Sequence, residues 1–139
     1  MKRHLLVLAS LLPTVGSVHA QSVGIVAEIP FDFVMDKTTL HAGKYIFLPI
    51  DLAGSTMLLR SSDRKEAIFI TPDACSSGRT QLESKLVFRA YGNEHFLWQI
   101  WTQGYDMGRE LHVNHRKIEK ANLAQPVPVV ILTTLGRAP

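Results

Sequence analysis

Residues 85–101, KLVFRAYGNEHFLWQIW, decide the fold class of this chain. Two runs rich in apolar and aromatic side chains flank the turn-forming residues Gly92 and Asn93, and this arrangement is typical of a β-hairpin. We predict an odd-length loop of Gly92, Asn93 and Glu94, in which glycine or asparagine can take the left-handed conformation. The chain therefore contains at least one antiparallel strand pair with a predictable register.

That register separates the hairpin into two faces. The apolar face pairs Leu86 with Ile100, Phe88 with Trp98 and Ala90 with Phe96. A shift of one residue would place Arg89 opposite Phe96 and mix the faces, because each slip moves every side chain to the other face of the sheet. The opposite face carries Lys85, Val87, Arg89, Tyr91, His95, Leu97, Gln99 and Trp101.

The segments before this hairpin also read as strands. Residues 23–33 alternate between apolar and polar side chains, which predicts a strand buried on one face. Pro30 lacks a backbone N–H, so this strand is expected at a sheet edge or with a bulge. Residues 57–60 and 67–71 are apolar runs on either side of a charged loop, and they predict a second hairpin.

After Gly108 the pattern changes. Residues 109–124 lack proline, glycine and alternation and predict one short helix. The tail, 125–139, is open between an edge strand and a frayed end. The fold class expected is mainly β: a single-domain antiparallel sandwich or small partly open barrel of about six or seven strands with this C-terminal helix.

The first 20 residues match a secretory signal peptide. Lys2 and Arg3 supply the positive start, residues 5–12 are apolar, and Val18-His19-Ala20 fits a signal peptidase site. We expect cleavage after Ala20 and export to the periplasm or beyond, with the β domain over 21–124. The apolar run is much shorter than the roughly 20 residues a membrane span needs, so no stable membrane anchor is expected.

Charge and cysteine content narrow the function classes. The chain has 15 Lys plus Arg and 12 Asp plus Glu, a net charge of +3. Two of the basic residues, Lys2 and Arg3, lie in the leader, so the remainder is nearly neutral and gives no reason to expect a nucleic acid partner. Cys75 is the only cysteine, which excludes an intramolecular disulfide framework.

Four sequence pieces carry a resemblance: IPFDF at 29–33, L-x-AG-x-Y at 40–45, KLVF at 85–88 and GREL at 108–111. On these the chain resembles a family of small exported bacterial β-rich proteins of unassigned function. The resemblance covers roughly residues 23–124 and implies no catalytic residues. In other members we expect a proline where His41 stands and a glycine near Asp36.

No residue pattern indicates catalysis, a cofactor or a metal. His112 and His115 have helical spacing, but a zinc site needs further ligands that the sequence does not mark. The serine pairs at 61–62 and 76–77 lie in predicted turns, and a nucleophile elbow is missing. We therefore expect a non-catalytic binding or structural role, with a small secreted hydrolase as the alternative.

The best candidate surface is aromatic, because rings flanked by polar groups bind sugars and peptides with little loss of entropy. We predict a carbohydrate or peptide site there, unless the helix covers the rings. In that case the edge at 23–33 is the alternative, where a protein partner would add a strand. The candidate residues are Trp101, Tyr91, Tyr105, Arg89, His95 and Gln99.

Overall fold

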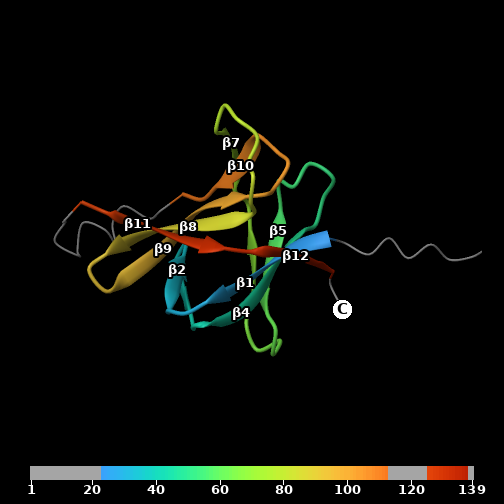
Figure 1. Ribbon diagram of the computed structural model, residues 1–139. Helices are drawn as coiled ribbons and strands as arrows, with labels where there is room; N and C mark the ends of the chain where they lie inside the picture. The colour runs from blue at the N-terminus through green and yellow to red at the C-terminus, as the bar shows by residue number, and fades with distance from the viewer. Residues whose placement is uncertain (1–22, 113–124, 138–139) are drawn as a thin grey trace, which may run out of the picture.

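The computed structural model describes residues 23–112 and 125–137, which form twelve strands in two sheets and contain no helix (Figure 1). The first sheet has the order β12-β1-β4-β5-β6. All its neighbouring strands are antiparallel. Its strands are β12 (Thr134–Arg137), β1 (Val23–Ile29), β4 (Gly43–Pro49), β5 (Met57–Ser61) and β6 (Ala67–Ile70).

The second sheet has the order β11-β8-β9-β10-β7, and β2 joins β9 in the one parallel pairing of the described chain, with β3 beyond it. Its strands are β11 (Val127–Leu132), β8 (Lys85–Tyr91), β9 (Glu94–Trp101), β10 (Met107–Glu110), β7 (Asp73–Ser76), β2 (Phe33–Met35) and β3 (Thr38–Leu40).

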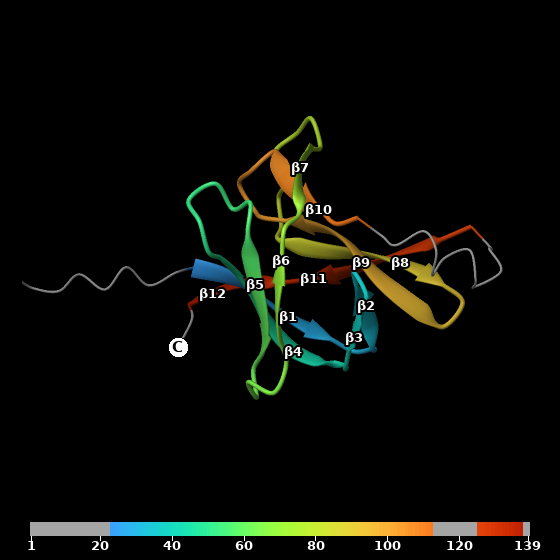
Figure 2. The same cartoon turned by 180° about the vertical axis from the view of Figure 1, so that it is seen from behind.

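The main hydrophobic core lies between the two sheets, which Figure 2 shows from behind. Phe47 and Leu59 from the first sheet and Phe33 and Phe88 from the second are fully buried within it. Phe88 meets Phe33 edge-to-face at 5.7 Å between ring centroids. Burial of apolar area between two sheets supplies most of the driving force for this arrangement. The prediction of a mainly β chain is confirmed, and the described strands form no closed barrel.

The chain passes between the sheets on the C-terminal side. β11 pairs with β8 in the second sheet, and after Thr133 the chain continues as β12 beside β1 in the first. The N–H of Thr133 donates to the carbonyl of Ser84 at 3.0 Å, which holds this crossing. The sequence left two alternatives for the tail, an edge strand or a frayed end. In the structure the tail contributes one strand to each sheet.

The prediction of an edge strand at 23–33 is wrong for the first half of β1. Val23 to Val26 are paired with β12 on one side, and β1 pairs with β4 on the other. Pro30 follows Ile29, the last residue of β1, so its missing N–H removes no bond from the strand. The C-terminal tail of the same chain supplies the strand next to Val23–Val26, so a partner protein cannot add a strand there.

The hairpin of β8 and β9 has a shorter turn than predicted. Gly92 has φ 60°, and Tyr91 pairs directly with Glu94, so the turn holds two residues rather than three. Arg89 therefore faces Phe96. A register shift between Val87 and Phe88 then restores the predicted pairing of Leu86 with Ile100. Between the turn and this bulge, the β9 side chains lie on the opposite face from the one predicted, because a one-residue slip moves every side chain to the other face of the sheet.

Three further differences concern short elements. Arg109 and Glu110, where the predicted helix begins, lie in β10, and residues 113–124 lie outside the described residues. The strand number exceeds the expected six or seven because several strands have only three or four residues, too few for a pattern to mark them. Asp36 has φ 50° in the β2–β3 turn, a conformation that favours glycine.

Candidate functional site

Trp101, the centre of the predicted aromatic surface, is buried with 6% of its surface exposed. Strand β10 covers it: a Cβ at Gly108 would stand 2.5 Å from the indole ring. The indole N–H donates to Gln99 Oε1 at 3.2 Å, and the Gln99 amide donates to Glu110 Oε2 at 2.8 Å. Trp101 and Gln99 therefore use their polar groups inside the protein.

The other predicted residues are separated. Tyr91 is half-buried and packs edge-on against Phe96. His95 stacks on Phe31 with 3.9 Å between ring centroids. The Arg89 guanidinium lies 3.5 Å from the centroid of the Trp98 ring and occupies one face of it. The structure thus does not gather the predicted residues on one exposed aromatic strip, and only Tyr105 among the predicted rings is well exposed, at 63%.

Tyr105 borders an apolar pocket of about 380 Å³ between the two sheets, the inter-sheet pocket. Its buried wall combines side chains from both sheets, namely Ile25, Phe47, Met57 and Ile100. Its rim carries apolar side chains that are about half exposed, namely Val23, Tyr105, Met107 and Leu135. Cavities of this size and composition are typical of small-molecule sites.

The loop 50–56 closes one side of this pocket. The Asp51 carboxylate accepts hydrogen bonds from the N–H groups of Ser55 and Thr56 at 2.9 and 2.8 Å. The bond from the Ser55 hydroxyl, followed by these backbone bonds, lowers the pKa of Asp51 to about 2. They stabilise the charged carboxylate and fix the loop that brings Gly54 to the pocket.

Arg109 of β10 is the one charged side chain among the described residues that line the pocket. It is half-buried, and its Nη2 donates to the carbonyl of Ala53. Gly54 has φ 64°, and a Cβ there would stand 2.8 Å from Nη2, so the loop approaches the guanidinium closely. Within the described part of the chain Arg109 forms no ion pair.

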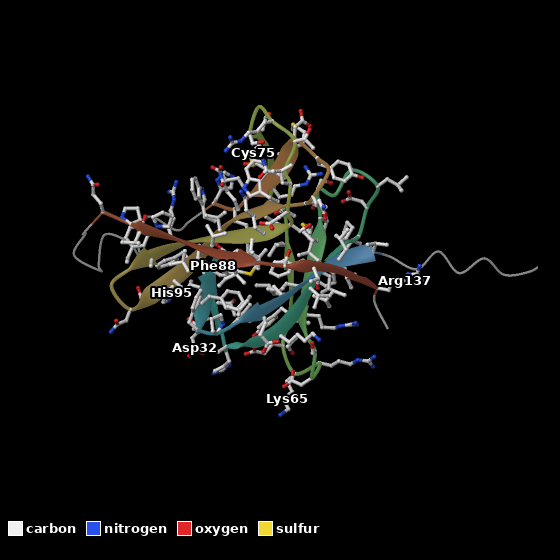
Figure 3. The ribbon with its side chains drawn as sticks, viewed as in Figure 1. Asp32, Lys65, Cys75, Phe88, His95 and Arg137 are labelled. Atoms are coloured by element: carbon white, nitrogen blue, oxygen red, sulfur yellow. The ribbon has the colours of Figure 1, made fainter. Side chains whose placement is uncertain are left out.

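A second concavity, of about 530 Å³, holds the polar cluster of His41, Tyr45 and Glu66. His41 Nδ1 lies 2.6 Å from Glu66 Oε1, and the Tyr45 hydroxyl donates to Glu66 Oε2. Burial, followed by the bond to Glu66, raises the pKa of Tyr45. The bonds from Tyr45 and then from His41 lower the pKa of Glu66, and the bond to Glu66 raises that of His41. Asp32 and Lys65, both labelled in Figure 3, mark the part of the molecule that holds this cluster.

The nucleophile candidates are engaged elsewhere or inactive. Ser61 Oγ bonds to Asp63 at 2.5 Å and accepts from the N–H of Glu66, and none of the described serines bonds to a histidine. Burial, and next the charge of Glu110, raise the pKa of the Cys75 thiol, which keeps it protonated at neutral pH.

The predicted histidine pair is only half described. His112 Nε2 lies 2.6 Å from Asp73 Oδ2 on β7, and His115 lies outside the described residues. Within residues 23–112 and 125–137 no group of three or more His, Cys, Asp or Glu is placed to hold a metal ion. The same residues include no helix with the length and hydropathy of a membrane span.

Comparison with protein-family models, with curated proteins and with solved structures finds no match to this chain.

Proposed function

We propose that this chain is an exported, non-catalytic binding protein that takes up a small apolar molecule in the inter-sheet pocket. The observation that carries the proposal is the combination of a buried apolar wall with a rim of half-exposed apolar side chains. A ligand there removes both surfaces from water, and this burial is worth roughly 25 cal/mol per Å² of apolar area.

The rim strengthens the proposal because its side chains come from three separate places. Val23 begins β1, Leu135 lies in β12, and Tyr105 with Met107 approaches from the second sheet. Contiguous apolar groups exposed at a cavity mouth mark interaction sites more often than scattered ones do. The pocket is therefore a better candidate than the dispersed aromatic residues.

The alternative of a secreted hydrolase rests on the polar cluster. Hydrolysis by a nucleophile needs a serine, cysteine or threonine beside an oriented base. His41 with Glu66 supplies a base and its orienting carboxylate, but Ser61 bonds to Asp63 instead. The cluster ties the loop before β4 to the loop before β6 and is explained by that role.

Export is the part of the proposal that the leader sequence supports. Cleavage after Ala20 would make Gln21 the first residue of the mature protein. Expression of the tagged chain in a Gram-negative host, followed by fractionation and N-terminal sequencing, tests this. An uncleaved chain in the cytoplasm would refute export and leave the binding proposal to its own test.

Binding is tested with Nile red, a neutral apolar dye whose fluorescence rises in apolar surroundings. Thr102 lines the pocket and is half-buried, so Thr102→Trp should fill the cavity and abolish the fluorescence gain. Thr38→Trp places the same ring on the exposed surface of β3 and should leave the gain unchanged. Equal dye binding by the wild type and both variants would overturn the proposal.

A further inference from the structure

The inter-sheet pocket pairs an apolar wall with a cation, Arg109, that has no counter-ion among residues 23–112 and 125–137. We infer that its ligand is a single-chain carboxylate amphiphile, whose apolar tail lies between the sheets and whose carboxylate binds Arg109. This inference rests on the proposed binding function and adds the chemical class of the ligand.

The first support is the environment of Arg109. A half-buried charge loses part of its hydration, and this loss costs free energy unless an opposite charge or hydrogen bonds replace the water. The carbonyl of Ala53 accepts one bond from Nη2, which satisfies one donor of a guanidinium that has several. The remaining donors are available to a bidentate acceptor such as a carboxylate.

The second support is that the nearest acidic residues in the sequence and in the loop are already bonded to other groups. Asp51 accepts from Ser55 and Thr56, and these bonds hold the loop. Glu110 follows Arg109 in β10, so its side chain points to the opposite face of the strand, where it accepts from Gln99. The charge of Arg109 is therefore left for a group from outside.

The third support is the size of the pocket. The cavity of about 380 Å³ lies within the range of pockets that hold one small molecule. It is therefore of a size for the single apolar chain of a molecule such as decanoate.

The test compares decanoate with decanol, which share a tail and differ in head-group charge, as competitors of Nile red at neutral pH. The wild type should bind decanoate more tightly than decanol. Arg109→Gln should weaken decanoate binding by about tenfold or more, since it removes charge-assisted hydrogen bonds, and should leave decanol binding unchanged. Arg109→Lys keeps the positive charge but lacks the two parallel N–H donors of the guanidinium. Its affinity for decanoate should lie between those of the wild type and Arg109→Gln.

Matched controls separate the possible failures. Arg89 stacks on Trp98 and does not line the pocket. Arg89→Gln should therefore change the affinity for neither decanoate nor decanol. Decanoate and decanol binding equally to the wild type would overturn the inference while the binding function stands. Failure of both ligands and of Nile red would overturn the proposed function itself. Binding to anionic phospholipid vesicles without binding to free decanoate would also overturn the inference, because it would assign the charge to a membrane surface.

Salt provides a second readout if Arg109→Gln fails to fold, which thermal unfolding would reveal. Added salt screens the attraction between the guanidinium and the carboxylate, so wild-type affinity for decanoate should fall with ionic strength. Affinity for decanol should not fall. Identical salt dependence for the two ligands would contradict a role for Arg109.

Discussion

The two concavities of this protein lie at opposite ends of β4 and treat their charged groups differently. At the Gly43 end, Glu66 is bonded by both His41 and Tyr45, so the charge of the cluster is satisfied inside the chain. At the Pro49 end, Arg109 in the inter-sheet pocket donates one hydrogen bond, to the carbonyl of Ala53, and forms no ion pair within the described part of the chain. Both cavities are of similar scale, and they differ in that the carboxylate of the first is paired within the chain, whereas the guanidinium of the second faces no carboxylate among the described residues.

This difference separates a structural cluster from a binding site. Buried or half-buried polar groups in folded proteins are nearly always hydrogen-bonded, so each exception needs an explanation. The polar cluster needs no ligand because its groups satisfy one another. Among the described residues Arg109 has the carbonyl of Ala53 but no carboxylate as a partner, and the apolar rim of the pocket is exposed. Four substitutions break or sharpen this comparison.

The largest effect is expected at the core that joins the two ends. Phe88 is fully buried and packs edge-on against Phe31 and Phe33, so Phe88→Ala should lower the free energy of unfolding by about 3–5 kcal/mol. Urea unfolding followed by fluorescence and circular dichroism should give one shared transition. Two separate transitions would show that the ends do not share a core. Phe69→Ala, on the exposed edge strand β6, should change stability by less than about 0.5 kcal/mol.

A smaller effect is expected at the apolar end. Gly108→Ala forces a Cβ to within 2.5 Å of the Trp101 ring, and such overpacking costs about 1–3 kcal/mol. Trp101 fluorescence should change as β10 moves, and Nile red affinity should fall because Gly108 also lines the pocket. Ala74→Ser, on the neighbouring strand β7 and exposed, is the control. Unchanged stability of Gly108→Ala would mean that β10 does not cover the ring.

The polar end should respond less. Glu66→Ala removes the carboxylate that accepts from Tyr45, but the hydroxyl still lies 2.7 Å from the carbonyl of His41. The two lost bonds to His41 are exposed and contribute little, so the loss of stability should be about 1 kcal/mol. Nile red and decanoate binding should not change. Glu28→Ala, at an exposed position of β1, should have no measurable effect. Lost ligand binding in Glu66→Ala would contradict the separation of the two ends.

The strands of this fold could be predicted from the sequence better than their partners. The alternation of 23–29 and the hairpin of 85–101 lie where the patterns placed them. The neighbour of β1 could not be predicted, since β12 comes from the far end of the chain. The turn at Gly92 was misassigned because the bulge that restores the outer register depends on packing against the core and not on local sequence.

The candidate site was beyond sequence reasoning for a related reason. The pocket collects residues from β1, β4, β5, β9, β10 and β12, and no local pattern marks such a set. Arg109 was assigned to a predicted helix, which hid its place on a strand beside loop 50–56. For Trp101 the sequence left open an exposed surface or cover by the predicted helix, and cover by β10 was not foreseen because Gly108 leaves no signal in a short strand of mixed composition. An aromatic residue in a hairpin does not reveal whether a further strand lies over it.

The smallest effect is a pH dependence confined to the polar end. Glu66 has a lowered pKa, so its contribution is present above its ordinary value of 4.5 and is lost as pH falls through the folded value. His41 has a raised pKa, to which Asp32 also contributes, so its contribution is present below 6.5 and is lost as pH rises through the folded value. The contribution of the cluster should therefore be greatest between pH 4.5 and 6.5. In thermal unfolding followed from well below pH 4.5 to well above pH 6.5, His41→Gln should flatten the alkaline limb and keep the acid limb, since Tyr45 still bonds to Glu66. If the alkaline limb persists in His41→Gln, the titrating group lies elsewhere in the protein. If the limb is lost while decanoate affinity stays unchanged, the polar cluster and the inter-sheet pocket act independently.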